Sequence, residues 1–265
     1  VCANLLGSCY GSTNPLSVNP ETGNSYLYEF PNLTPRDLAR SLELLRQHIG
    51  IDEINTIIGG SLGGQVAIEW AYLLQHQVKN TVILASTAKT SPWTIAFNES
   101  QRIAIETDCT WGNPDQNAGK KGMEAARAIA MISYRHPEDF AKKQSDTTEK
   151  FDGFRVSSYL RYQGQKLANR FNAFSYWVLS KAMDSHDLGR GRGGVEKALE
   201  EIPSKVLAIG VDRDLLFVRE ESQFIAQQVP KGTYREIHST FGHDAFLIEY
   251  EQLQYILGSF FLEGI

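Results

Sequence analysis

The chain has 265 residues, of which 42% are hydrophobic and 22% charged, and a formal net charge of −5 at pH 7. This composition predicts a globular protein with a sizeable core rather than a disordered chain. The negative charge argues against nucleic-acid binding, and no apolar run is long enough to span a membrane. Three scattered cysteines are too few for a disulfide framework or a zinc site, so we expect a cytoplasmic protein without a metal.

The first part of the chain predicts one strand, a long loop and one helix. Val1–Leu6 reads as a buried strand that ends in a glycine turn. Residues 12–33 are rich in Asn, Pro, Ser and Gly, which is typical of a loop. Leucines and an isoleucine at helical spacing then predict an amphipathic helix from Thr34 to Ile49, which ends at Gly50.

The next stretch, Ile54–Ala71, contains the strongest motif of the sequence. A β-branched run passes into Gly59-Gly60-Ser61-Leu62-Gly63, and apolar residues at helical spacing follow. The pattern G-x-S-x-G between a strand and a helix is typical of a nucleophile elbow, whose tight turn favours glycine around the serine. Ser61 is therefore predicted to be a catalytic nucleophile. The alternative is an ordinary glycine-rich turn that contains a serine.

The remaining chain alternates between sheet and helical patterns. Further buried strands are predicted at residues 81–85, 205–210 and near 234–237, and a closing helix from about Ala245 to Glu263. Strand–helix–strand order is the parallel α/β pattern. Together with the nucleophile elbow it predicts an α/β-hydrolase fold, a mostly parallel sheet flanked by helices, formed by residues 1–89 and 201–265. Residues 90–200 lack a convincing strand and are predicted to form an inserted helical lid. Because this fold places its nucleophile after the fifth strand, we expect a chain that is N-terminally truncated.

A serine hydroxyl needs a base within hydrogen-bond reach and a carboxylate that orients the base. In this fold the order along the chain is serine, acid, histidine, with each residue after a strand. Asp214 follows the strand at 205–210 and His243 follows the last strand, so these two are the predicted acid and base. Asp212 and His238 are the alternatives. The backbone N–H of Leu62 is the predicted oxyanion donor.

Several motifs together indicate a family. They are NLLGSCYG at 4–11, GGSLGG at 59–64, DLLF at 214–217 and GHDAFL at 242–247, with lid segments such as SYR at 133–135 and RFNA at 170–173. In combination they resemble the homoserine O-acetyltransferases of the α/β-hydrolase superfamily. The resemblance implies transfer of an acetyl group from acetyl-CoA to the hydroxyl of L-homoserine through an acyl-serine, in methionine biosynthesis. It also implies a homodimer and no cofactor besides the co-substrate.

The resemblance also implies how homoserine binds. Arg127 would pair with the carboxylate of the substrate, and Asp244 would receive its ammonium group. A zwitterion in a dry tunnel needs one fixed cation and one fixed anion, and arginine offers a bidentate fork. Tyr134 lies two helical turns after Arg127 on the same face, where it either shapes the tunnel or serves as a core aromatic.

The sequence leaves some alternatives open. Homoserine O-succinyltransferase activity, a serine esterase or thioesterase of the same fold, and a truncated non-catalytic copy are all compatible with the triad. Residues 189–194, Gly-Arg-Gly-Arg-Gly-Gly, follow no strand and so lack the context of a dinucleotide site. They read as a flexible lid loop, or as a loop whose Arg190 and Arg192 contact coenzyme A phosphates.

Overall fold

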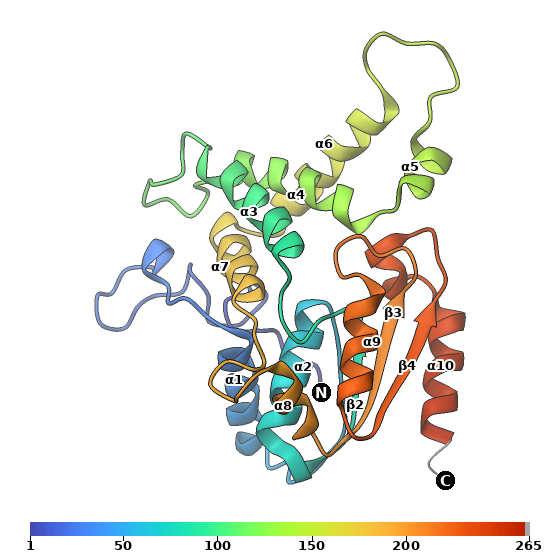
Figure 1. Cartoon of the computed structure of the whole chain (residues 1–265). Helices are drawn as coiled ribbons and strands as arrows, with labels where there is room; N and C mark the ends of the chain where they lie inside the picture. Colours follow the sequence, from blue (N-terminus) through green and yellow to red (C-terminus); the bar gives the residue numbers. More distant parts are fainter. Residues whose placement is uncertain (263–265) are drawn as a thin grey trace. The chain divides into compact units, whose positions relative to one another are not determined.

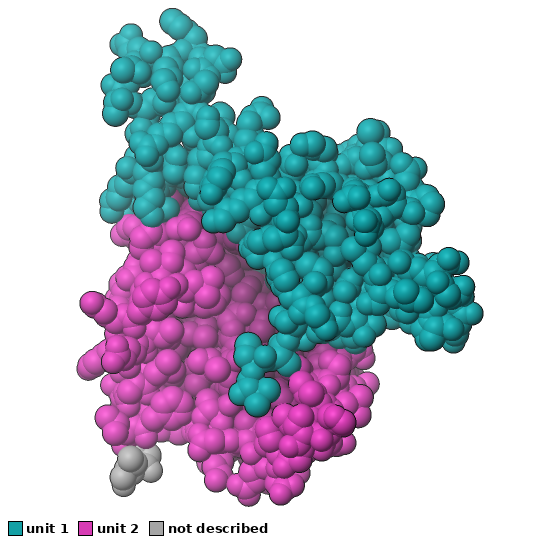
Figure 2. Space-filling model, turned by 180° about the vertical axis from the view of Figure 1, so that it is seen from behind, with its two compact units in different colours: residues 1–34, 92–133, 137–185 teal, residues 35–91, 134–136, 186–265 magenta. Residues whose placement is uncertain are grey.

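The computed structural model describes residues 1–262 and divides into two compact units. Unit 1 comprises residues 1–34, 92–133 and 137–185, and unit 2 comprises residues 35–91, 134–136 and the described residues from 186 onward (Figure 2). Residues 1–34 therefore group with the helices of the central segment, whereas residues 186–200 group with the sheet. Each of the two units has its own buried core.

Unit 2 contains the sheet (Figure 1). Its four strands within the described residues are β1 (Ile54–Gly60), β2 (Val78–Leu84), β3 (Lys205–Val211) and β4 (Gly232–Ile237). They lie in the order β1-β2-β3-β4, and every neighbouring pair is parallel. The strands predicted from Ile54 onward are confirmed, whereas the one predicted at Val1–Leu6 is not. Because all four run the same way, their carboxyl ends meet at one edge of the sheet, where Ser61 and the segments after β3 and β4 lie.

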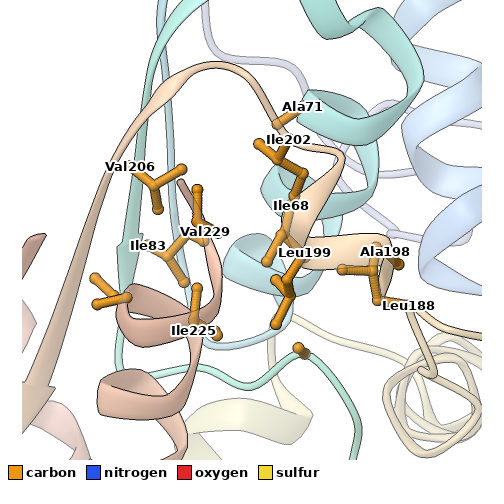
Figure 3. Packing of buried hydrophobic residues seen from close by; sticks show 13 residues of the cluster. Ile68, Ala71, Ile83, Leu188, Ala198, Leu199, Ile202, Val206, Ile225 and Val229 are labelled. Carbon is orange, nitrogen blue, oxygen red and sulfur yellow. The ribbon is translucent and has the colours of Figure 1, made fainter. Parts of the chain in front are cut away.

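Helices cover both faces of this sheet. They are α1 (Pro35–His48), α2 (Leu62–Leu74), α8 (Val195–Glu200), α9 (Arg219–Gln228) and α10 (Tyr250–Leu262). Successive strand residues point to opposite faces, so one strand contributes to two cores. Ile83 of β2 packs in a cluster with α2, α8 and α9, whereas its neighbour Val82 packs in a cluster with α10. Figure 3 shows the first cluster, including Ile68 of α2, Leu199 of α8 and Ile225 of α9.

Unit 1 is helical. It contains η1 (Leu27–Glu29), α3 (Pro92–Glu106), most of α4 (Lys120–Tyr134), α5 (Pro137–Gln144), α6 (Arg155–Ala168) and α7 (Ala173–Asp184). Ile105 of α3, Met123 of α4 and Leu167 of α6 form part of its core. As predicted, no strand lies between β2 and β3 among residues 1–262. None of the helices in this described part is both long and apolar enough to cross a membrane.

Two predicted elements differ from the structure. Val1–Leu6 does not form a strand: Val1 is exposed, and the Ser8 N–H donates to the Leu5 carbonyl in a turn. A short apolar run forms a strand only when a neighbouring strand accepts its backbone hydrogen bonds, which the sequence pattern cannot supply. The closing helix α10 begins at Tyr250, because residues 242–247 form the separate 3₁₀ helix η3. Glu263 lies outside the described residues.

Candidate active site

Ser61 occupies a strained turn between β1 and α2. Its φ of 53° and ψ of −123° are rare for a residue with a side chain. Two hydrogen bonds hold the turn: the Ser61 N–H donates to the Leu84 carbonyl (2.9 Å), and the Ser86 hydroxyl donates to the Ser61 carbonyl (2.7 Å). At Gly59 a Cβ atom would lie 2.1 Å from the carbonyl oxygen of Gly63, so only glycine fits there. The tight turn at Ser61 therefore requires glycine at position 59, as the elbow motif predicts.

The residues after Ser61 begin helix α2. Leu62 is its first residue, and an N–H in the first turn has no intrahelical acceptor. The positive end of the helix dipole also favours negative charge at this position. Gly63, the last glycine of the motif, faces open space, whereas a Cβ at Gly64 would lie 2.6 Å from the Ser86 Cβ. Close packing behind the elbow therefore depends on Gly64 rather than on Gly63.

His243 connects Ser61 to Asp214. Its Nε2 lies 3.0 Å from the Ser61 Oγ, and its Nδ1 lies 2.7 Å from the Asp214 Oδ2. The other oxygen of Asp214 accepts the backbone N–H groups of Leu216 (2.8 Å) and Phe217 (3.0 Å). A carboxylate at Nδ1 keeps the imidazole proton there and leaves the Nε2 lone pair to accept from the serine hydroxyl. This is the arrangement that general-base activation of a serine requires.

The surroundings of His243 act on its pKa in opposite directions. Burial, the largest influence, disfavours the charged imidazolium and lowers the pKa. The negative charge of Asp214, its hydrogen bond to the imidazole and the negative charge of Asp244 raise it. The carboxylates outweigh burial, so the pKa of His243 lies above its ordinary value of 6.5. The neutral, base form of His243 is accordingly favoured only at a higher pH than for a free imidazole.

The alternative acid and base also lie side by side, but away from Ser61. The His238 Nδ1 is 3.3 Å from the Asp212 Oδ2, and the His238 side chain is 71% exposed. The other Asp212 oxygen accepts the Ser239 N–H (3.0 Å). Asp212 thus organises the loop after β4. The structure brings Asp214 and His243, and not this second pair, into a hydrogen-bonded chain with Ser61.

The other predicted site residues fall in different places. The Tyr134 ring lies 5.6 Å from the His243 ring, centre to centre, so Tyr134 forms part of the surroundings of His243. Asp244 forms an ion pair with Arg135, with 3.1 Å between Nε and Oδ2. Arg127 lies half-buried on α4 within unit 1. The sequence reasoning assigned no role to Arg135, although its position directly after Tyr134 is a signal that could have identified it.

The glycine-rich loop 189–194 holds a structural cation. Arg192 lies 2.8 Å from the carboxylate of Glu69, which is 2% exposed, and its guanidinium stacks 3.7 Å from the centre of the Tyr72 ring. Arg36 contacts the same carboxylate at 3.3 Å. Arg192 is therefore already paired with a buried anion, which argues against the alternative that it contacts a coenzyme A phosphate. Among the described residues, no group of three or more His, Cys, Asp or Glu side chains could hold a metal ion.

Comparisons with known proteins place this chain among its relatives. The family described as alpha/beta hydrolase fold matches residues 1–250. A homoserine O-acetyltransferase of Cyclobacterium marinum is 66% identical over 264 residues, which cover 100% of this chain and 75% of that protein. One from Thermus thermophilus is 49% identical, covering 98% of this chain and 66% of the relative. The crystal structure of homoserine O-acetyltransferase from Bacillus anthracis, 24% identical, shares the fold with a TM-score of 0.85 over 92% of this chain and 70% of that one.

Proposed function

Because this chain belongs to the homoserine O-acetyltransferase family of the α/β-hydrolase fold, we propose that it transfers an acetyl group from acetyl-CoA to the hydroxyl of L-homoserine. The observation that carries the proposal is the hydrogen-bonded chain Asp214–His243–Ser61 at the carboxyl edge of the sheet. The sequence similarity to homoserine O-acetyltransferases supports the choice of substrates. The geometry supports the roles of Ser61 as nucleophile, His243 as base and Asp214 as orienting acid.

The first half-reaction acetylates Ser61. The Ser61 Oγ attacks the thioester carbonyl while His243 Nε2 takes the hydroxyl proton, and Asp214 stabilises the imidazolium that forms. The oxyanion of the tetrahedral intermediate accepts the N–H of Leu62. The C–S bond then breaks, and the coenzyme A thiolate leaves with the proton from His243. The product is acetyl-Ser61.

The second half-reaction moves the acetyl group to homoserine. His243 takes the proton of the homoserine hydroxyl, whose oxygen attacks the acetyl carbonyl, and Ser61 leaves and recovers that proton. In this proposal Arg127 holds the substrate carboxylate and Asp244 its ammonium group, while Tyr134 lines the site.

The test is to identify the acyl-enzyme and its acceptor. We expect acetyl-CoA to add one acetyl group to Ser61, detected by mass spectrometry, and homoserine to remove it as O-acetylhomoserine. Ser61→Ala should show neither step. An acetyl group on a different residue, or full turnover by Ser61→Ala, would refute the assignment. If water removes the acetyl group as fast as homoserine does, the protein is an esterase. If Ser61 is not acylated at all, the protein is a non-catalytic copy.

The preferred acyl donor is measured in the same way. We expect acetyl-CoA to acylate Ser61 faster than succinyl-CoA does at equal concentrations. The opposite order would identify a succinyltransferase. The proposal also includes a cytoplasmic location and a homodimer. All three cysteines are free, which suits a reducing compartment such as the cytoplasm. Light scattering of the purified protein tests the dimer.

A further inference from the structure

The segment 134–136 packs directly against the loop that carries His243. These three residues belong to unit 2, although the segments on either side of them belong to unit 1. Gly242 has a φ of 62°, and a Cβ there would lie 3.0 Å from the His136 nitrogen and 3.1 Å from the Tyr134 carbonyl oxygen. The two backbones are therefore in contact, and the base-bearing loop rests on this segment.

Arg135 contacts this loop on both sides of His243. Its Nε lies 3.1 Å from the Asp244 Oδ2, and its guanidinium carbon lies 5.6 Å from the centre of the Phe241 ring. The side chains of Arg135 and Asp244 are only 18% and 19% exposed, so water screens this ion pair weakly. One cation thus holds the two residues that flank the catalytic turn.

We propose that Arg135 is a positioning residue for His243, which it serves by holding the flanking loop and by neutralising the carboxylate of Asp244. The proposal rests on the proposed function only in taking His243 as the base of Ser61. It also gives Asp244 a second role, because its carboxylate anchors the loop as well as receiving a substrate ammonium group.

Electrostatics make this role measurable. The charged and titratable groups near His243 include Asp214 after β3, Asp244 in η3, Tyr134 at the end of α4 and, through Asp244, Arg135. Glu221 of α9 interacts with Asp214, and burial together with the charge of Asp214 raises the pKa of Glu221 to about 7. Every variant below keeps Glu221, so its titration is common to all the profiles compared. The charge of Asp244 raises the pKa of His243. The cation of Arg135 opposes that effect. Without it the imidazolium is more stable, so the base form of His243 appears only at higher pH.

The experiment measures acylation of Ser61 by p-nitrophenyl acetate as a function of pH. In this step the serine oxygen bonds to the acetyl carbon, the serine proton goes to His243, and p-nitrophenolate leaves. Release is followed at the wavelength where p-nitrophenol and its anion absorb equally. Arg135→Gln should shift the acid limb of the pH–rate profile for acylation to higher pH by about one unit, the lower end of the pKa shift that a nearby charge causes. Arg135→Lys, which keeps the charge, should leave the limb in place.

Two further variants separate positioning from general damage. Arg40→Gln removes an exposed arginine whose partner is 3.9 Å away, and it should leave the profile unchanged. Arg135→Gln combined with Asp244→Asn leaves no unpaired charge, so it tests the proposal even if Arg135→Gln alone does not fold. Its acid limb should lie at or below the wild-type position. An unshifted limb in Arg135→Gln, or a raised limb in the double variant, overturns the proposal.

The assay contains neither homoserine nor coenzyme A. Acetyl transfer to homoserine is measured in a separate experiment. If the proposed function is wrong, the wild-type enzyme is still acylated by the ester but transfers no acetyl group when homoserine is added. Failure of the inference on Arg135 appears as pH profiles that do not depend on residue 135.

Discussion

Asp214→Asn is the substitution that tests the site most directly. The asparagine oxygen would still accept the N–H groups of Leu216 and Phe217, so its NH₂ group would face His243. An NH₂ group donates, and the Nδ1 of the imidazole would have to accept. The imidazole proton would then sit on Nε2, which faces the Ser61 hydroxyl and could no longer take its proton.

The expected loss can be worked from the geometry. In the transition state the imidazolium of His243 lies beside the Asp214 carboxylate, with 2.7 Å between Nδ1 and Oδ2. Two unit charges about 4 Å apart at an effective dielectric constant of about 20 attract by about 4 kcal/mol. Losing this attraction lowers the rate about a thousandfold, at ~1.4 kcal/mol per factor of ten. The wrong tautomer adds to this loss, so we expect a decrease of about 10³- to 10⁴-fold.

The assay is the rate of Ser61 acylation by acetyl-CoA in single-turnover experiments across pH. Asp214 raises the pKa of His243, so Asp214→Asn should also move the acid limb of the remaining activity to lower pH. Asp212→Asn is the matched control, because Asp212 pairs with the exposed His238 instead. Equal losses in the two variants, or a loss of less than tenfold in Asp214→Asn, would show that the predicted triad is not the catalytic one.

Three further predictions concern the elbow, the substrate site and the core. Gly59→Ala should lower the free energy of unfolding by about 3 kcal/mol, because its methyl group would overlap the backbone of Gly63. Gly63→Ala is the control and should not lower it, because the space around Gly63 is open. Urea denaturation measures the free energy of unfolding of both variants. Arg127→Ala should slow homoserine-dependent deacylation about 10- to 100-fold but not acylation, and Lys121→Ala on the same helix should slow neither. Glu69→Ala should cost about 3 kcal/mol in unfolding free energy, since it leaves two arginines without their buried anion; an unchanged urea midpoint would contradict this.

Short-range properties of the sequence determined much of this protein. The elbow at Ser61 follows from sterics within a few residues, because a side chain at Gly59 would overlap the backbone of Gly63. Short runs of β-branched and other apolar residues between turn signals located the four strands of the described residues, because that combination is typical of buried strands. The order of serine, acid and histidine, which follow β1, β3 and β4, then identified Asp214 and His243 as the residues most suited to act on the serine.

Only the tertiary structure decided how distant residues pair. Asp214 and Asp212 have similar sequence surroundings, and a difference of two positions determines which one faces the histidine of η3. The partner of Asp244 is Arg135, more than 100 positions earlier in the chain, and no local pattern encodes that contact. The same holds for Val1–Leu6, where an apolar run meets no neighbouring strand. Hydrogen bonds and ion pairs depend on distances of a few ångströms, and those distances exist only once the chain has folded.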